Sequence, residues 1–423
     1  MPNRLTRRAM VVWLAAVAVY VVAITGRTSF GVAGVMAMGR FEIDASRLAV
    51  FTAVQVGIYA LAQIPTGMLV DKFGPRALLL AGAIVMGLGQ ILLAFAPAYW
   101  MAIAARVLIG AGDATAFLSV MRLIPVWFPA KLAPLFSQLT GALGQSGQFI
   151  SAVPFLYMLN TTGWTWAFLS LGAVGILIAA AAWICISDTP DTARSQRSLK
   201  VPAAAGPRLS LGMRLRMVLR SVTAWQGVWI HWSNLSPLNI FLLLWGVPLM
   251  KLGMGLSPSA IATVLITATI GSVCAGPLHG LISARAGRHR DVVALATSLL
   301  NCWLFIWFLS SEQPRSQATL MVMILVVALL TPAANYGFDS VREKLQYSVL
   351  ATGTGLANMG GFIATMLGAQ LLGSILDWHA GGKEFRWEDF QVAWWAVVVV
   401  WAIGAIGIVV CAKKIRTQQT PKT

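Results

Sequence analysis

Charged residues are scarce in this sequence, and acidic residues are the scarcest of them. Only 11% of the 423 residues are charged, whereas soluble domains carry about 25%. Lysine and arginine together number 31, against 14 for aspartate and glutamate. With 58% hydrophobic residues and a mean hydropathy of +0.76, the composition excludes an ordinary soluble domain. It predicts an integral membrane protein with many spans.

Cysteine is also rare, and its four copies stand apart from one another. Cys185, Cys274, Cys302 and Cys411 fall singly inside or at the ends of apolar runs. The spacing of a metal site is missing and disulfides are not expected, so we interpret these cysteines as small packing residues. The sequence predicts no metal and no other cofactor.

Long apolar runs fill most of the chain. A helix that spans a bilayer needs about 20 mostly apolar residues. Twelve runs meet this requirement, at residues 10–37, 46–70, 76–96, 99–126, 134–158, 166–187, 223–250, 257–283, 291–310, 317–338, 350–376 and 391–411. The first run is too long for a signal peptide and lacks a small-residue cleavage site, so we expect it to remain as a helix.

A polar and basic stretch separates the sixth run from the seventh. Its prolines and its Ala/Ser-rich centre are typical of a linker. We therefore predict an N-terminal six-helix bundle at 1–187, a cytoplasmic linker at 188–222 and a C-terminal six-helix bundle at 223–423. The basic residues that close the linker favour an amphipathic helix on an anionic membrane face. These residues are Arg214, Arg216 and Arg220.

The net charge of +17 could indicate nucleic-acid binding, but the distribution of the charge argues against it. Lysine and arginine gather in alternate loops, as the positive-inside rule requires. If the N-terminus lies inside, the basic residues in outer loops are Arg40, Arg47, Lys251, Arg315, Lys383 and Arg386. We predict a multi-pass protein of the cytoplasmic (inner) membrane with both termini in the cytoplasm. Its partner is then the lipid bilayer, and not nucleic acid.

A short polar loop joins the second run to the third. Residues 67–76 read Gly-Met-Leu-Val-Asp-Lys-Phe-Gly-Pro-Arg. The frame returns at 280–290, where Ala284 stands in the position of Asp71. A loop repeated at half the chain length, with apolar runs on both sides, indicates a duplicated transporter.

This loop closely resembles the signature of the major facilitator superfamily. The resemblance covers the whole chain and implies an all-helical membrane fold with 12 transmembrane helices in two six-helix bundles and a substrate site between them. It also implies a transporter that is not an enzyme, and we expect a monomer. A membrane enzyme or assembly factor is the alternative class. It would need a polar loop with clustered acids or histidines, and only 377–389 comes near.

Charged groups inside a bilayer are costly, and they therefore indicate function. Arg27 lies about mid-way along the first run. Its guanidinium can offer forked donors to a carboxylate or phosphate in a water-filled cavity. The alternative is an arginine that Asp113 or helix carbonyls neutralise.

The fourth run contains two charged residues. Arg106 and Asp113 are separated by about 700° of helix, which places both on one face. A carboxylate buried inside a span can take up and release a proton near physiological pH. We assign Asp113 and Arg106 to proton coupling. A fixed ion pair of Asp113 with Arg106 or Arg27 remains the alternative.

These residues sharpen the resemblance to the anion:cation symporter branch of the superfamily. The matching segments are Arg27-Thr-Ser-Phe-Gly-Val-Ala33, Gln63 to Arg76, Arg106 with Asp113, Trp127-Phe-Pro129 and Gly355 to Gly361. Members of that branch take up organic anions such as sugar acids and sialic acid together with protons. One position departs, because Gly26 replaces the acid that precedes the first-helix arginine in the family.

Neutral polar residues on other runs complete the predicted substrate site. With Arg27 we place Gln55, Tyr59, Gln145, Gln148, Asn239 and Asn358 in it. His231 and Asn234 are further candidates. Each of these side chains is about as able to bridge helices as to bind a polyhydroxy substrate.

We predict that Asp71, Arg76 and Arg122 act in gating. Asp71 lies in a short cytoplasmic loop, Arg122 ends the fourth run, and the eleventh run begins near Thr352. An acid at a helix N-terminus that also pairs with arginine would hold the cytoplasmic side closed.

The predicted function is proton-coupled uptake of a small organic anion, such as a sugar acid or another carboxylate, by alternating access. Proton-driven efflux of drugs or metabolites is the alternative. The fifth run weakens that alternative, because Gly141 to Gly147 lacks the Gly-Pro pair of drug-antiporter signatures.

Overall fold

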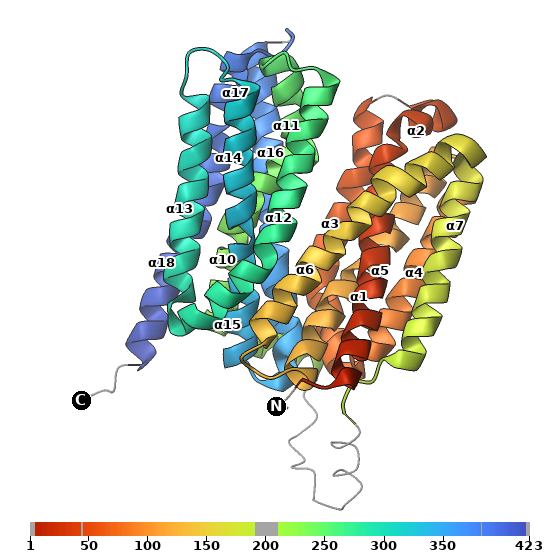
Figure 1. Cartoon of the computed structure of the whole chain (residues 1–423), viewed down its shortest axis with the longest axis vertical. Coiled ribbons are helices and arrows are strands. Elements are labelled where there is room, and N and C mark those ends of the chain that lie inside the picture. The colour runs from red at the N-terminus through yellow and green to blue at the C-terminus, as the bar shows by residue number, and fades with distance from the viewer. Residues whose placement is uncertain (1–4, 44, 191–209, 382, 420–423) are drawn as a thin grey trace, which may run out of the picture. The chain divides into compact units, whose positions relative to one another are not determined.

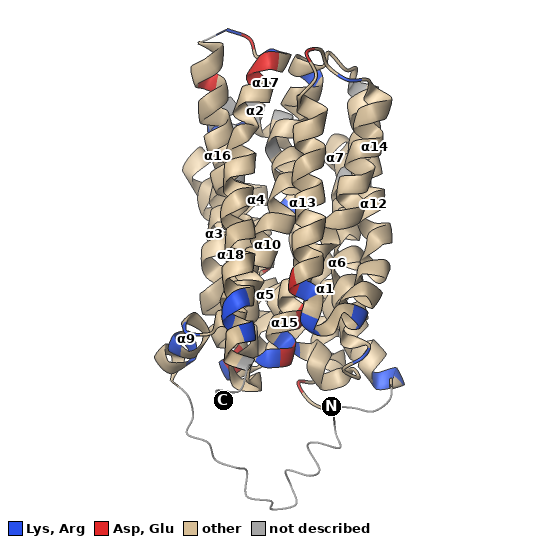
Figure 2. Cartoon of the chain, turned by 90° about the vertical axis from the view of Figure 1, so that its left-hand side faces the viewer, with Lys and Arg blue, Asp and Glu red and all other residues tan. Residues whose placement is uncertain are grey.

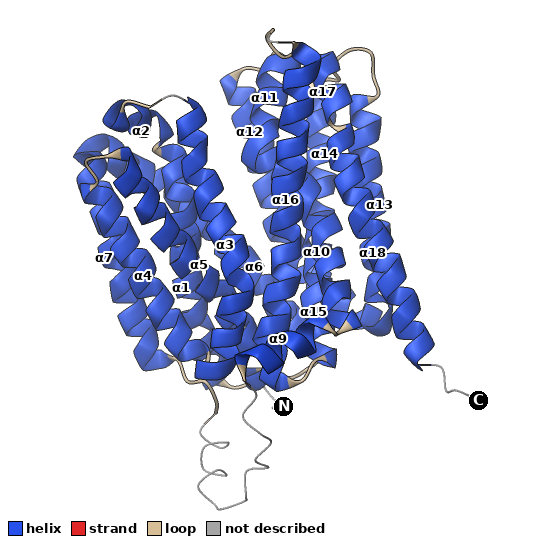
Figure 3. Ribbon diagram, turned by 180° about the vertical axis from the view of Figure 1, so that it is seen from behind, coloured by secondary structure: helices blue, strands red, loops and turns tan. Residues whose placement is uncertain are grey.

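Helices account for nearly all of the described structure. The computed structural model describes residues 5–43, 45–190, 210–381 and 383–419 (Figure 1). Within these ranges no residue belongs to a strand, and the connections between helices are short (Figure 3). The central part of the predicted linker, 191–209, lies outside the described residues.

The chain divides into two compact units. Unit 1 contains Met1–Val218 and Gln346–Gly355, and unit 2 contains Leu219–Leu345 and Leu356–Thr423. Unit 1 therefore includes the first residues of a long helix, α16 (Leu350–Ala380), that continues in unit 2.

Unit 1 is built mainly from the first seven α-helices and one π-helical turn. The α-helices are α1 (Arg7–Val32), α2 (Gly34–Phe41), α3 (Ala45–Phe73), α4 (Pro75–Phe95), α5 (Tyr99–Trp127), α6 (Ala133–Ile150) and α7 (Leu156–Cys185), and the turn is η1 (Ser151–Phe155). The short α9 (Leu211–Leu219) and η6 (Tyr347–Val349) complete it. Of the basic residues predicted to lie on the membrane face, Arg214 and Arg216 belong to α9, and Arg220 follows it.

Unit 2 contains the remaining helices. They are α10 (Val222–Ile240), η2 (Phe241–Trp245), α11 (Gly246–Pro248), η3 (Leu249–Gly253), α12 (Pro258–Ala286), η4 (Gly287–His289), α13 (Arg290–Leu309), α14 (Gln317–Leu330), η5 (Thr331–Asn335), α15 (Tyr336–Lys344), most of α16, α17 (Trp387–Ala393) and α18 (Trp395–Gln419).

The described helices supply twelve membrane crossings. Nine stretches are long and apolar enough to span a bilayer, and the bent pair Val222–Leu243 and Gly246–Gly253 makes a tenth. Two stretches, Ala133–Cys185 and Ser259–Leu309, have 53 and 51 residues. At 1.5 Å per residue each is about 80 Å long, more than twice the roughly 30 Å of hydrocarbon. Gly163 and Gly287, with φ of 81° and 48°, break them, so each crosses twice.

Several predicted runs are divided between elements in the structure, among them those at 134–158, 223–250 and 391–411. The run at 10–37 is divided, because α1 ends at Val32 and α2 follows. The run at 317–338 is divided by η5, which contains Pro332 near its start. Proline lacks a backbone N–H and crowds the preceding turn, so the regular α-helix stops there and resumes as α15.

Glycines allow the helices of unit 1 to approach closely. A Cβ on Gly112 of α5 would lie only 2.8 Å from the backbone nitrogen of Met86 in α4. On α6, a Cβ on Gly147 would lie 2.9 Å from the backbone nitrogen of Thr25 in α1. Close backbone packing of this kind is how membrane helices associate without a hydrophobic driving force. It fixes α1, α4, α5 and α6 around the charged residues described below.

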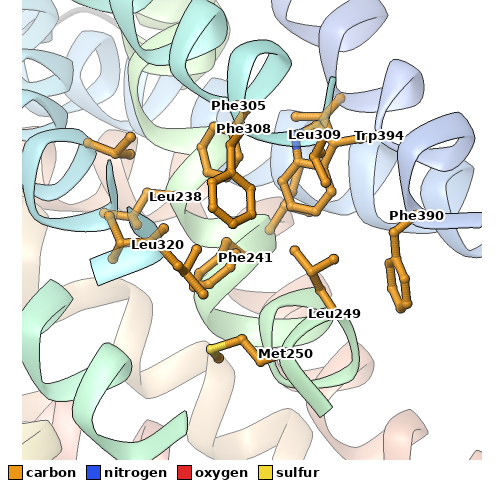
Figure 4. Packing of buried hydrophobic residues seen from close by; sticks show 14 of the residues in the cluster. Leu238, Phe241, Leu249, Met250, Phe305, Phe308, Leu309, Leu320, Phe390 and Trp394 are labelled. Atoms are coloured by element: carbon orange, nitrogen blue, oxygen red, sulfur yellow. The ribbon is translucent and has the colours of Figure 1, made fainter. Parts of the chain in front are cut away.

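Unit 2 has an apolar core formed by several helices. Phe241, Phe305 and Trp394 are buried together with leucines and Met250 (Figure 4). Phe305 of α13 stacks on Trp394, which lies between α17 and α18, with ring centroids 5.0 Å apart. Basic residues lie at the ends of α15 and α18 near the C-terminus (Figure 2). The buried residues of this core are all uncharged.

Candidate functional site

An ion pair lies inside unit 1, between α1 and α5. The Nε of Arg27 donates to Oδ2 of Asp113 at 2.6 Å, and its Nη2 donates to Oδ1 at 2.9 Å. The Asp113 side chain has no exposed surface, whereas 21% of the Arg27 side chain is exposed. This two-point geometry is the strongest form of an arginine–carboxylate contact. Of the two partners left open for Asp113, the structure pairs it with Arg27.

Aromatic rings surround the two arginines of this site. The guanidinium carbon of Arg27 lies 4.3 Å from the centroid of the Tyr59 ring of α3. That of Arg106 lies 4.8 Å from the centroid of Phe30, one turn beyond Arg27 on α1. Contacts of a guanidinium with an aromatic face are favourable, and more so away from water. The predicted residues Arg27, Tyr59, Arg106 and Asp113 thus form one cluster on α1, α3 and α5.

Arg106 is less well paired than Arg27. Only 1% of the residue is exposed. Its Nη2 donates to the carbonyl of Arg27 over 3.4 Å. Its Nε and Nη1 have no hydrogen-bond partner among the described residues. Burying an arginine without partners for its donors is costly. The cluster therefore contains hydrogen-bond donors that are unused in this conformation.

Gln55 is a second buried side chain with unused hydrogen-bonding capacity. It is 1% exposed, and among the described residues neither its Nε2 nor its Oε1 has a partner. A Cβ on Gly110 would lie 3.3 Å from its Cγ, so Gln55 packs on α5 one turn from Arg106. Gln55 therefore borders the charged cluster.

Gly26 lies where the family resemblance implies an acid, and a glutamine occupies the adjacent space. The Nε2 of Gln90 of α4 donates to the carbonyl of Gly26 at 3.2 Å. A Cβ on Gly26 would lie 2.8 Å from that same nitrogen. A side chain at position 26 would therefore displace Gln90, a neutral group that sequence reasoning did not single out.

Gln145 and Gln148 hydrogen-bond to each other on α6. The Nε2 of Gln148 donates to Oε1 of Gln145 at 2.5 Å, and both residues are half-buried. Nearby, the hydroxyls of Thr28 and Ser151 lie 2.7 Å apart and join α1 to η1. These groups give unit 1 a neutral polar surface beside Arg27.

The predicted site residues of unit 2 are uncharged. Asn239 is half-buried on α10, and Asn358 is buried on α16. Asn234 has a packing role, because it donates to the carbonyls of Ile230 and Ala294 and accepts from Thr297. His231 is buried, with its ring centroid 4.8 Å from that of Phe338.

Asp71 lies at the other end of unit 1 and accepts four hydrogen bonds. Its Oδ1 accepts from Nε of Arg122 and from the backbone nitrogen of Ala351, both at 3.0 Å. Its Oδ2 accepts from the nitrogen and the hydroxyl of Thr352, at 2.8 and 2.7 Å. A carboxylate in this position compensates the N-terminal end of α16. Asp71, Arg122 and Thr352 are brought together as predicted.

Arg76 does not join that group. Its Nε and Nη2 donate to the carbonyl of Trp183 at 3.1 and 2.8 Å, and its guanidinium carbon lies 4.0 Å from the Trp183 ring centroid. Its backbone nitrogen donates to Asp188 at 2.8 Å. Arg76 thus ties α4 to the end of α7.

Sequence reasoning missed an ionic network in unit 2. The Arg290 guanidinium donates to both carboxylate oxygens of Glu343, at 2.6 and 2.7 Å. Asp339 accepts from Ser283 and from Arg342. The signal was the charged run of α15, which directly follows a long apolar run. In the repeated loop, Ala284 has no carboxylate to make the contacts that Asp71 makes in the first loop.

Comparisons with known proteins agree with this architecture. The chain is 26% identical over 191 residues to the probable sulfoacetate transporter SauU of Cupriavidus necator, covering 45% of this chain and 44% of the relative. It is 24% identical over 389 residues to the probable galactarate/D-glucarate transporter GarP of Escherichia coli K12, covering 83% and 84%. The first of these alignments thus spans less than half of the relative.

Solved structures share the fold. The structure of the proton:xylose symporter XylE bound to 6-bromo-6-deoxy-D-glucose matches with a TM-score of 0.72, at 13% identity and over 94% of both chains. The predicted all-helical membrane fold is confirmed, and the relatives and structural neighbours are transporters and not enzymes. The family model described as Major Facilitator Superfamily matches residues 16–369. The chain is a multi-pass membrane protein that belongs to the Major Facilitator Superfamily.

Proposed function

We propose that the chain takes up a small organic anion together with protons, by alternating access, across the cytoplasmic (inner) membrane. Both termini would lie in the cytoplasm, since the basic residues concentrate in the loops on that side. The names of the relatives support the substrate class, because sulfoacetate, galactarate and D-glucarate are organic anions. A monomer suffices for this function, because each chain contains both units.

The Arg27–Asp113 pair is the observation on which the proposal rests. Among the acids in the described spans of unit 1, Asp113 is the one that lies away from the helix ends. Both of its carboxylate oxygens accept hydrogen bonds from the guanidinium of Arg27. A proton on Asp113 would remove one charge of the pair and release the fork of Arg27 for an anion. Proton binding and anion binding would then favour each other, which is the requirement for symport.

The neutral residues would orient the anion after it reaches Arg27. Tyr59, Gln145 and Gln148 lie on helices that pack around α1 and α5, and Gln55 has unused amide atoms among the described residues. Asn239 and Asn358 are the further residues that we propose for substrate binding. Hydroxyl groups of a sugar acid need both donors and acceptors of this kind.

Uptake into proteoliposomes tests the proposal. Purified protein should accumulate D-glucarate or sulfoacetate when the outside is more acidic, and should lose that accumulation when a protonophore collapses the gradient. Reversing the gradient separates uptake from the alternative of proton-driven efflux. Transport of cationic drugs against an opposed proton gradient, with no anion flux, would contradict the proposal.

A further inference from the structure

The charges inside unit 1 do not balance. Away from the helix ends, its described spans contain two cations, Arg27 and Arg106, and one acid, Asp113. Both oxygens of Asp113 bind Arg27. Arg106 therefore has no acid of its own and no hydrogen-bonded carboxylate among the described residues, although only 1% of it is exposed. Uncompensated charge in a membrane interior is expensive and indicates a functional partner.

The unused hydrogen-bond donors of this cluster also indicate an anion as the partner of Arg106. Nε and Nη1 of Arg106 and the amide of Gln55 are buried, and none of these atoms has a hydrogen-bond partner in the described part of the chain. Gln55 packs on Gly110, one helical turn beyond Arg106. A guanidinium with an amide close by suits the planar, two-oxygen geometry of a carboxylate, or the oxygens of a sulfonate.

The two arginines are close enough to serve one small molecule. Nη2 of Arg106 reaches the backbone carbonyl of Arg27, and Arg106 covers Phe30, one turn further along α1. The two guanidinium groups thus lie along the same short segment of α1. Because Arg106 is enclosed in this conformation, the ligand must reach it in another state of the transport cycle.

We propose that Arg106 and Gln55 form a second anion subsite, so that the transporter recognises a dianion with one charged group at Arg27 and the other at Arg106. This inference rests on the proposed function and narrows its substrate class. With a proton on Asp113 the cluster has a charge of +2, which a dianion neutralises. A monoanion would leave one arginine uncompensated in that state.

Matched pairs of anions test this proposal on the full chain. D-Glucarate and D-gluconate differ by one terminal carboxylate, and sulfoacetate and acetate differ by one sulfonate. Binding to the purified protein should favour the dianion of at least one pair by about 10- to 100-fold, the range of a charged hydrogen-bonded contact. Arg106→Gln should remove this preference, so that the two members of each pair bind with similar affinity.

Stability of the ligand-free protein gives a readout that a merely structural arginine would not produce. Since Arg106 is uncompensated, Arg106→Gln should keep or raise the melting temperature without ligand and reduce the shift caused by the dianion. Gln90→Leu is the matched control, because it removes a buried amide that binds Gly26, and it should keep the dianion preference.

Several results would overturn the subsite. These are equal affinity within both pairs, a dianion preference that Arg106→Gln retains, a response to chloride alone, or no binding of either dianion. Gradient-driven uptake of a monoanion with no dianion preference would refute the subsite and leave the proposed function intact. Absence of any anion flux would refute the proposed function as well.

Discussion

Unit 1 and unit 2 contain the same repeated loop, yet they place their charges differently. In unit 1 an ionic cluster of Arg27, Asp113 and Arg106 lies inside the helices. In unit 2 the ionic contacts of Arg290 and Arg342 lie near the helix ends, and the buried polar groups further along α10 are uncharged. The comparison shows that unit 1 has ionic groups inside its helices where unit 2 has neutral ones, and it motivates our proposal that unit 1 performs the proton and anion chemistry.

Breaking the Arg27–Asp113 pair should have the largest effect on the protein. Removing one member of a buried ion pair typically costs about 3–5 kcal/mol, because the other member stays buried and uncompensated. We expect Arg27→Ala to lower the free energy of unfolding by this order and to abolish anion binding. Arg27→Lys should bind the anion weakly, because lysine lacks the planar fork.

The double variant Arg27→Ala with Asp113→Asn separates the two consequences. It leaves no uncompensated charge at this position, so it should recover most of the stability lost by Arg27→Ala, and it should still fail to bind anions. Thermal unfolding and ligand-induced shifts measure both quantities. If the substrate proves neutral or cationic and Arg27→Ala binds it normally, the organic-anion function is wrong.

Substitution of Asp71 should have an intermediate effect on stability and transport. Asp71→Asn removes the charge that pairs with Arg122 and accepts hydrogen bonds from the start of α16. We expect a loss of about 1–3 kcal/mol at this contact, a larger population of inward-open molecules and slower transport. Labelling of single cysteines placed in the cytoplasmic cavity measures the population. Unchanged labelling with normal flux would show that Asp71 is no gate.

A matched control comes from Arg76, which was predicted as a gating residue. Its contacts go to Trp183 and Asp188 and not to Asp71. Arg76→Gln should therefore leave the cysteine labelling pattern closer to that of the unaltered protein than Asp71→Asn does. A shift as large as that of Asp71→Asn would place Arg76 in the gate after all.

The smallest effects are expected in unit 2. Asn239→Ala and Asn358→Ala each remove at most one or two neutral hydrogen bonds, so each should weaken anion binding only by about 2- to 10-fold. Neither should change the dependence of uptake on the pH gradient. If either substitution abolished the dependence of uptake on the pH gradient, the assignment of proton coupling to unit 1 would be incorrect.

The overall fold was accessible from sequence because it follows from composition and periodicity. The apolar runs predicted the crossings, and the loop at 67–76 indicated the family that the family model over residues 16–369 confirms. Helix ends were less predictable. The division of the tenth run at Pro332 depends on local backbone geometry, which hydropathy does not report.

The residue types of the site were predicted from the sequence, but the arginine that pairs with Asp113 was not. Spacing placed Arg106 and Asp113 on one face of α5, whereas Asp113 binds Arg27 on α1. That choice depends on how closely α1 approaches α5, and one sequence cannot supply it. The same limit applies to Gln90 and to the Arg290–Glu343 network, whose partners come from other helices.

The central claim is that Asp113 couples proton movement to anion movement, and one measurement on Asp113→Asn tests it most directly. Proteoliposomes are assayed for uptake with an imposed pH gradient and for counterflow exchange without one. We predict that Asp113→Asn loses gradient-driven accumulation and retains at least part of the exchange, because asparagine cannot carry the proton. Full gradient-driven accumulation by Asp113→Asn would contradict the account.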